Sequence, residues 1–418
     1  MGVLALAIVA LQGCLTNRAP RTPTTIAGIE PREPEIRVRL IRLEPGESIT
    51  IGEPGTLTLR SINGTRIGTA SGPITVDVTT AGAWLLGGNG VATPIETGLV
   101  LDAPGDLFIE GKQHPGWIEL RRVPSNSEDG AVEIIAELGL EQYLPGVLIA
   151  ELPSDWAPAT FEAQSVAARG YAIDQRTRAR RVGRVWDVTD TVSHQVYAGR
   201  ATNSTAINAA GNTRGRVLTF EGELLPAYYS AVCGGRNAGP GETWGGQALQ
   251  TRSAVTPLDA RPRPHHCQHA PRYRWTVTRS TEACSKRLAA WGQRAGHELA
   301  GVGTIRSIAA ERLNAAGRPI RFRVTDTAGG SFSIRAEQLR IALNHAPESV
   351  PLERAQRVHS SDIAVGIAGP AITITGQGFG HGVGLCQHGA QAMASNGASL
   401  DQILSRYYPG ATLARVYD

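Results

Sequence analysis

The chain has 418 residues, of which 41% are hydrophobic and 19% are charged. This length allows two or three domains, and this composition excludes an intrinsically disordered protein. The net charge of +4 is small for the length, and nucleic-acid binding requires a clustered basic face, so no nucleic-acid partner is expected. The 49 glycines and 25 prolines favour strands, turns and loops over long helical bundles.

The chain begins with an apolar run at residues 2–10, followed by Leu11-Gln12-Gly13-Cys14. The run is too short to span a bilayer, which needs about 20 residues, but it has the length of the hydrophobic part of an export signal. The four residues after it resemble a bacterial lipobox, and a buried first strand with an ordinary cysteine is the alternative. We therefore expect a signal peptide at 1–14, lipidation at Cys14 and a Pro-rich linker at 15–35.

These features predict an exported lipoprotein that faces the periplasm and touches the membrane only through its lipid anchor. The residue directly after the cysteine is Leu15 and not an aspartate. This favours the outer membrane in a cell with two membranes.

Residues 36–125 are expected to form a β-rich N-terminal region, because apolar and polar residues alternate along several short segments. Turns are predicted at Pro54-Gly55 and Asn63-Gly64. The predicted strands are 36–41, 57–60, 74–78 and 117–120, the last pairing with 132–135 around a polar loop at 124–130.

Helical signals begin at Leu140, where Leu144, Val147, Leu148 and Glu151 share one stripe. Pro145 is compatible with the first turn of this helix, and Pro153 ends it. A second helix is predicted from residue 157 or 158 to about 180, with Ser154 or Asp155 as its cap.

The rest of the chain mixes both kinds of element. Strands are predicted at 217–220, 273–278, 322–324 and 372–375, helices at 281–296, 387–396 and 400–407, and a glycine-rich loop at 376–384. The expected fold class is α+β: the β-rich part is followed by a mixed α/β catalytic domain at 126–418, with a cleft between helical and strand-rich lobes.

Glu151 is the most informative single residue, because it is a carboxyl on an apolar stripe. Loss of hydration disfavours its charged form and raises its pKa, which suits a general acid near neutral pH. The alternative is a surface glutamate at a helix C-terminus, where the helix dipole makes an anion unfavourable.

The loop at 376–384 holds five glycines in nine residues, which permits close approach of a ligand to the backbone. It precedes a helix, so its amide groups could face a polar ligand. It lacks the Gly-Lys-Ser/Thr of a phosphate-binding loop and the glycine spacing of a dinucleotide site. His381 in this loop is weak evidence of function by itself.

The run His265-His266-Cys267-Gln268-His269 offers four potential metal ligands, but they are too close in sequence to reach one tetrahedral ion easily. We predict no metal and no cofactor, and favour a loop held by a disulfide at Cys267. The four cysteines after Cys14 allow three full pairings. We prefer Cys233 with Cys267, and the other pairings stay open.

Several motifs together resemble the stage II sporulation protein D family, including its amidase-enhancer-like members. The resemblance runs from about residue 105 to the C-terminus. It rests on in-order motifs at residues 140–147, 150–153, 163–172, 194–199, 229–235, 244–245, 380–390 and 407–410.

The resemblance implies a lytic transglycosylase that cleaves peptidoglycan glycan strands stripped of stem peptides, in cell-wall remodelling, with Glu151 as the catalytic acid. It also implies the residues around the substrate. Arg169 would orient a substrate acetamido group or Glu151, or else form a structural ion pair. Gln164 and Tyr197 would line the cleft or hold the loop. His381 and Gln387 would face Glu151. Tyr228 would stack on sugar or belong to the core.

Three departures from the family pattern matter. Some members carry zinc ligands where this chain has Thr189 and His194, and the missing cysteines predict no zinc there. Glu162 replaces a basic residue, and His388 replaces an aromatic one.

The competing hypothesis is a non-catalytic peptidoglycan-binding module that localises or stimulates a cell-wall amidase. Retention of Glu151 and of the glycine-rich loop favours the enzyme.

Overall fold

The computed structural model describes residues 26, 31–87, 92–123, 130–245 and 265–418, and the predictions for residues 1–14 lie outside this part of the chain. The helices are α1 (Leu140–Glu151), α2 (Pro158–Arg181), α3 (Ser204–Asn212), α4 (Pro240–Trp244), α6 (Thr281–Ala295), α7 (Ala336–Asn344), α8 (Gln387–Ser395) and α9 (Leu400–Tyr407), with 3₁₀ turns η2 (Glu298–Gly301) and η3 (Arg354–Gln356). No helix among the described residues is long and apolar enough to cross a membrane.

The strands of the N-terminal half are β1 (Glu35–Leu43), β2 (Ser48–Ser61), β3 (Arg66–Thr79), β4 (Gly82–Leu86), β5 (Ala92–Pro94), β6 (Gly98–Asp102), β7 (Leu107–Ile109), β8 (Lys112–His114), β9 (Trp117–Arg122), β10 (Val132–Gly139) and β11 (Val188–Thr189). Those that follow are β12 (Arg216–Phe220), β13 (Glu223–Leu224), β14 (Tyr229–Ser230), β15 (Arg274–Ser280), β16 (Ile305–Leu313), β17 (Pro319–Asp326), β18 (Ser331–Arg335), β19 (Ile363–Ala368), β20 (Ala371–Gln377), β21 (Leu385–Cys386) and β22 (Thr412–Arg415). The α+β class with a β-rich N-terminal part is confirmed.

Strands β1 to β11 form one eleven-stranded sheet, whose main path runs β11-β1-β10-β9-β6-β2-β3-β4-β5. The predicted pairing of β9 with β10 is confirmed. Strand β1 lies between β10 and β11, antiparallel to the first and parallel to the second. Since β10 leads directly into α1, the sheet continues beyond residue 125 and shares its core with the first helices.

Pro54 and Gly55 do not form the predicted turn, because they lie inside β2. The pairing of β2 with β3 shifts register between Ile51 and Gly55, so the extra residues form a bulge while the strand continues. The predicted turn at Asn63-Gly64 is confirmed. Gly64 has φ of 83°, a left-handed conformation that favours glycine between β2 and β3.

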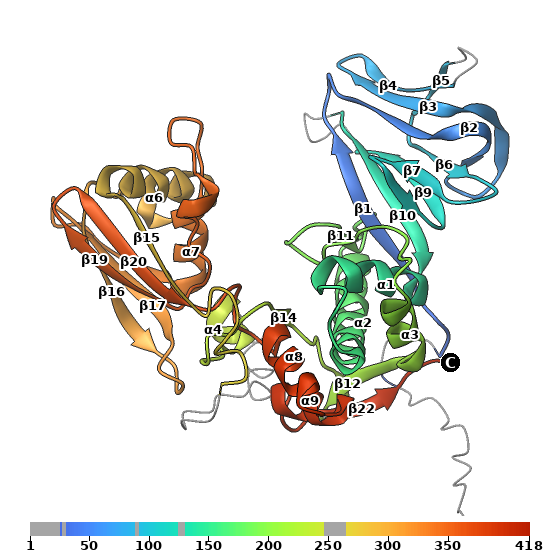
Figure 1. The fold of residues 1–418 in the computed structure, drawn as a ribbon. Helices are drawn as coiled ribbons and strands as arrows, with labels where there is room; N and C mark the ends of the chain where they lie inside the picture. The colour runs from blue at the N-terminus through green and yellow to red at the C-terminus, as the bar shows by residue number, and fades with distance from the viewer. Residues whose placement is uncertain (1–25, 27–30, 88–91, 124–129, 246–264) are drawn as a thin grey trace, which may run out of the picture.

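The helices α1, α2 and α3 form a layer beside this sheet, and α8 and α9 return from the C-terminal part to pack on α2 (Figure 1). Both predicted helices at 140–151 and 158–180 are confirmed, although Pro145 lies in the second turn of α1. The predicted cap of α2 is wrong, because its N-cap is Ala157. Among the described residues no side chain caps this helix. Oε1 of Gln391 in α8 accepts hydrogen bonds from the backbone N–H of Ala157 (3.0 Å) and the hydroxyl of Thr160 (2.8 Å), which joins α8 to the start of α2.

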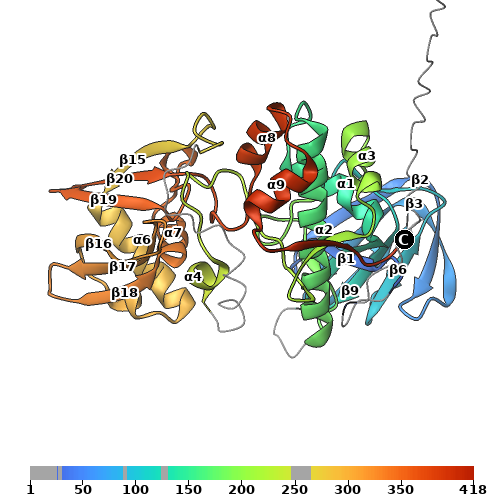
Figure 2. The same ribbon diagram turned by 90° about the horizontal axis from the view of Figure 1, so that it is seen from below.

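Residues 274–377 form a second strand-rich unit with a core of its own. Its two three-stranded sheets, β15-β20-β19 and β16-β17-β18, are accompanied by α6 and α7. Figures 1 and 2 show this unit at one end of the molecule and the N-terminal sheet at the other, with the helical layer between them. An open pocket lies at the second unit, lined by residues such as Trp275, Phe322 and Ile363 and also by Arg236. The cleft expected between helical and strand-rich lobes stays a prediction.

A buried ion pair joins α1 to α2. The guanidinium of Arg169 donates to both carboxylate oxygens of Glu141, at 2.8 and 2.7 Å. The same carboxylate accepts from the hydroxyl of Tyr417 (2.7 Å) and the backbone N–H of Gly215 (3.1 Å). Burial acts to raise the pKa of Glu141, but these donors outweigh it and hold the pKa below its usual value. One carboxylate therefore binds α1, α2, the start of β12 and the C-terminus together.

Replacing Arg169 with alanine should cost about 3–5 kcal/mol of unfolding free energy, because it leaves the Glu141 carboxylate buried without its charge partner. The matched control is Arg178→Ala on the same helix, where a 40% exposed side chain pairs with Asp174. That change should cost no more than about 0.5 kcal/mol. Urea unfolding of the three proteins measures both effects, and similar losses for the two variants would contradict the special role of Arg169.

Candidate functional site

Glu151 is the last residue of α1, and two donors from distant segments hold its half-buried carboxyl group. Its Oε1 accepts from the backbone N–H of Val196 at 3.3 Å, and its Oε2 accepts from Nε2 of Gln387 at 3.2 Å. Leu144 and Leu148, on the same stripe of the helix, are fully buried. The helix therefore carries Glu151 from an apolar core to the point where the segment after β11 meets the start of α8.

The ionisation of Glu151 follows from this position. Burial raises its pKa, while the hydrogen bonds from Gln387 and Val196 act in the opposite direction and only partly offset it. The direction agrees with the expectation drawn from the apolar stripe. A carboxyl group with a raised pKa retains a proton closer to neutral pH, as a general acid requires.

A buried polar chain lies close to this carboxyl group. The hydroxyl of Tyr143 donates to Oε1 of Gln195 at 3.3 Å, and Nε2 of Gln195 donates to the hydroxyl of Tyr229 at 3.0 Å. The Glu151 charge contributes to raising the pKa of both tyrosines, although burial is the largest cause. Because Val196 follows Gln195 directly, this chain fixes the backbone that donates to Glu151.

Three aromatic rings gather at the opposite end of the short β14·β21 ladder. Tyr228 precedes β14, and its ring centroid lies 4.6 Å from that of Trp244 and 6.5 Å from that of His381. Trp244 and His381 are 5.0 Å apart. Burial lowers the pKa of His381 to about 4, so its ring is neutral at physiological pH. His381 therefore belongs to an aromatic cluster that includes the predicted Tyr228, and no described contact joins it to Glu151.

The glycine-rich loop packs against protein, which corrects the expectation that its glycines leave room for a ligand. A side chain at Gly384 would meet the carbonyl oxygen of Tyr228, and one at Gly378 would meet that of Val232. Both glycines have positive φ, of 70° and 82°. The loop is glycine-rich because it lies directly on residues 228–234, and this contact brings Gln387 to Glu151.

For two of the predicted site residues, Arg169 and Tyr197, the contacts agree with the structural alternative. Arg169 is fully buried, and Nε, Nη1 and Nη2 all donate to protein groups, so none is left for a sugar. Tyr197 is also fully buried, with its ring 5.0 Å from that of Tyr143. A side chain on Gly146 would collide with the Tyr197 ring, which shows that this ring holds the loop against α1.

Gln164 lies in α2 and is fully buried. Within the described part of the chain neither amide atom has a hydrogen-bond partner. Gln387 faces Glu151 as expected, and its role in substrate binding stays a prediction. The donor to the other oxygen of Glu151 could not be predicted, because residue type does not reveal the partner of a backbone N–H. Trp244 falls within a family motif, but its ring contacts depend on the fold.

The positions where some relatives of the family carry zinc ligands hold a neutral contact here. The hydroxyl of Thr189 and Nδ1 of His194 are hydrogen-bonded at 3.0 Å. Asp187, two residues before Thr189, is fully buried and pairs with Arg37 at 2.9 Å. The segment is thus held by hydrogen bonds and an ion pair of its own.

The predicted disulfide requires a correction. Cys233 and Cys267 lie side by side, but both are free thiols, and their sulfurs are 3.6 Å apart where a disulfide needs about 2.05 Å. A third buried thiol, Cys386, joins them. The sequence alone does not show that three cysteine side chains lie next to one another in the folded protein.

Two family models match parts of the chain. A family model described as stage II sporulation protein matches residues 128–220, which include α1, α2 and Glu151. A second, described as a domain of unknown function (DUF8618), matches residues 257–384, which include the second strand-rich unit.

The chain is similar to the amidase enhancer of Bacillus subtilis (strain 168), with 29% identity over 310 residues. That match covers 65% of this chain but only 40% of the relative. It is 27% identical over 320 residues to stage II sporulation protein D of Bacillus amyloliquefaciens, covering 72% of this chain and 80% of the relative. For stage II sporulation protein D of Bacillus subtilis (strain 168) the identity is 26% over 300 residues, covering 68% and 77%. Taken with the motifs around Glu151 and Gln387, these matches show a stage II sporulation protein domain at residues 128–220 and similarity of the chain to members of the stage II sporulation protein D family.

Proposed function

We propose that this protein is a lytic transglycosylase that cleaves the bond between N-acetylmuramic acid and N-acetylglucosamine in peptidoglycan strands without stem peptides. The observation that carries the proposal is the Glu151 carboxyl group: it is half-buried, has a raised pKa, and is held through both oxygens by donors from two other segments. Such fixed geometry and such a pKa are what proton transfer to a leaving oxygen needs.

The reaction needs one proton to be delivered and one to be removed. Protonated Glu151 donates to the glycosidic oxygen as the bond to C1 of the muramoyl unit breaks. The resulting carboxylate then accepts the proton of the C6 hydroxyl, whose oxygen bonds to C1 and closes a 1,6-anhydro ring. Glu151 ends protonated, as it began. Val196 and Gln387 stabilise the carboxylate form between the two transfers.

The surroundings of Glu151 in the described part of the chain favour this outcome over hydrolysis. Hydrolytic glycosidases use two carboxyl groups, one of them to activate water or attack the sugar. Among the described residues, the causes of the Glu151 pKa shift are burial and the two hydrogen bonds, and no neighbouring acid contributes. A single acid that also acts as the base fits intramolecular attack by the C6 hydroxyl.

The central test is Glu151→Gln, which keeps the shape of the side chain but cannot transfer the proton. Strand cleavage should fall by a factor of about 10²–10⁴. Because burial raises the pKa of Glu151, its ionised form opposes folding at neutral pH, so the variant should be at least as stable as the wild type. Mass spectrometry of products from stripped glycan strands should find 1,6-anhydro ends from the wild type. Exposed Glu223 supplies the control, and Glu223→Gln should cleave normally.

Other outcomes of this experiment separate the alternatives. Full cleavage by Glu151→Gln would show that the acid lies elsewhere, and reducing ends would show a hydrolase. If wild type and variant both bind strands and neither cleaves, the protein is a binding module that serves a cell-wall amidase. The observation that favours this second candidate function is the similarity to a protein named amidase enhancer.

The pH dependence tests the role of Gln387. Activity that depends on protonated Glu151 should fall as the pH rises through the Glu151 pKa. The Gln387 hydrogen bond lowers that pKa, so Gln387→Leu should raise it and move the alkaline limb of the kcat profile to higher pH. Gln391→Leu is the matched control on α8, since Gln391 binds Ala157 and Thr160. It should lower stability and leave the limb in place. If the alkaline limb of the kcat profile lies at the same pH in Gln387→Leu and the wild type, this role of Gln387 is wrong.

We also propose that the protein is an exported lipoprotein held at the outer membrane through Cys14. Cys14→Ser should release it to the soluble fraction or leave the signal uncleaved, and intact mass should lose the lipid. Cys284→Ser should fractionate like the wild type. Unchanged mass and fractionation of Cys14→Ser would overturn the lipobox hypothesis.

A further inference from the structure

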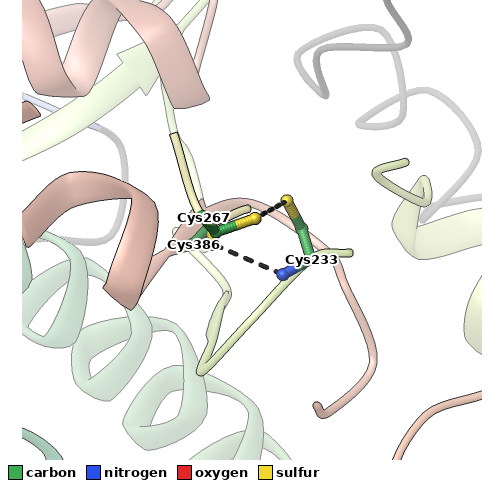
Figure 3. Close-up of side chains that lie close together, drawn as sticks. All are labelled: Cys233, Cys267 and Cys386. Atoms are coloured by element: carbon green, nitrogen blue, oxygen red, sulfur yellow. Dashed lines mark hydrogen bonds between the residues drawn. The ribbon is translucent and has the colours of Figure 1, made fainter. Parts of the chain in front are cut away.

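Three cysteines that are far apart in the sequence meet at one buried point beside the proposed active site. Cys233 follows β14, Cys267 lies in the segment before β15, and Cys386 ends β21. Their exposed fractions are 6%, 3% and 0%. Their three Sγ atoms all lie within 4.8 Å of one another, and Figure 3 shows the three side chains converging.

This spacing fits a shared ligand. Sulfurs bound to one tetrahedral zinc ion at about 2.3 Å stand about 3.8 Å apart, and Cys233 and Cys267 are separated by 3.6 Å. A disulfide would use two of the sulfurs and leave the third buried without a role. We propose that Cys233, Cys267 and Cys386 bind one thiophilic divalent cation, zinc, as three thiolates.

The surroundings suit a negatively charged centre. The backbone N–H of Cys233 points at Sγ of Cys386, with 3.3 Å between nitrogen and sulfur. Such donors stabilise thiolate ligands and orient them. Three thiolates around Zn²⁺ carry one net negative charge, which an enclosed site must balance with a nearby cation.

Arg318 supplies that cation. It is 1% exposed, and its guanidinium donates to the carbonyl oxygens of Cys233, Arg236 and His381 and to the hydroxyl of Ser361. These acceptors are neutral. The adjacent carboxylate of Asp362 is engaged in a two-point pair with Arg236, at 3.0 and 2.6 Å. The carboxylates of Asp362 and Glu337 also act on Arg318, but each is paired with another arginine, Arg236 or Arg340. A metal–thiolate centre would add the negative charge that Arg318 lacks at hydrogen-bond distance.

Three thiolates leave one position of a tetrahedron for solvent or an imidazole. The ring of His265 packs against Gly235, two residues after Cys233, where a side chain would collide with it. The His265 nitrogens are not within 4.8 Å of all three sulfurs, so in this structure the fourth position is left to solvent. The site differs from the one at residues 187–195 that some relatives use, because it draws its ligands from other segments.

The location gives the metal a structural consequence. It would tie together the chain entering the second strand-rich unit, the segment at Cys267, and the strand that returns from the unit. Cys386 directly precedes Gln387, which donates to Glu151. The metal would thus fix the strand end from which Gln387 reaches the catalytic carboxyl group.

The test measures metal rather than activity. Full-length protein purified without chelator, or reduced and supplied with Zn²⁺, should hold about one zinc per chain by elemental analysis. Substitution with Co²⁺ should produce sulfur-to-cobalt charge-transfer absorption. Cys386→Ser and Cys267→Ser should reduce occupancy at least tenfold under the same conditions. Cys284→Ser is the matched control, because Cys284 is equally buried but lies in α6 outside the cluster. It should retain the metal.

Three results would overturn the proposal: wild type that stays metal-free after reduction and supply of Zn²⁺, Cys386→Ser that retains full occupancy, or a native mass two hydrogens lower with a linked Cys233–Cys267 peptide. If the serine variants fail to fold, the wild-type cobalt spectrum decides. Alkylation adds an independent readout: the three thiols should react only after a chelator removes the metal, and equal reactivity before and after would contradict the site.

Discussion

The arrangement of the helical layer depends on one buried carboxylate. Glu141 stands at the start of α1 and binds Arg169, Tyr417 and the backbone of Gly215, which belong to three other parts of the chain. Removing two charges from water is costly unless each finds its partner in good geometry. The pair therefore tolerates only one relative placement of α1 and α2, and the direction of α1 decides where Glu151 points at its other end.

Much of this fold could be predicted from local pattern. Alternation located β1, β3, β9 and β10, and the stripe ending at Glu151 located α1, because side-chain period and burial are properties of a short segment. The same stripe gave the direction of the Glu151 pKa. Local pattern failed where the partner is distant in sequence. Gln391 of α8 binds the start of α2, and Pro54-Gly55 bulges within a long strand because β3 continues the pairing.

The site was predictable to the extent that its chemistry lies in side chains within family motifs. Gln387 reaches Glu151, whereas Arg169 and Tyr197 also lie in family motifs and serve the core. Residue type cannot separate these roles, since a buried arginine and a substrate-binding arginine look alike without their neighbours. The Val196 N–H and the meeting of Cys233, Cys267 and Cys386 depend on tertiary structure alone.

The second strand-rich unit leaves and re-enters the helical part through neighbouring strands. β14 and β21 pair in parallel, and Val232 and Phe379 exchange backbone hydrogen bonds just beyond them. A folded insertion with adjacent ends adds little strain to its host, and closing a longer loop costs only slightly more entropy. The whole unit can therefore be replaced at its base, by evolution or design, with a different folded module. The new module must only return its chain to β21 beside β14.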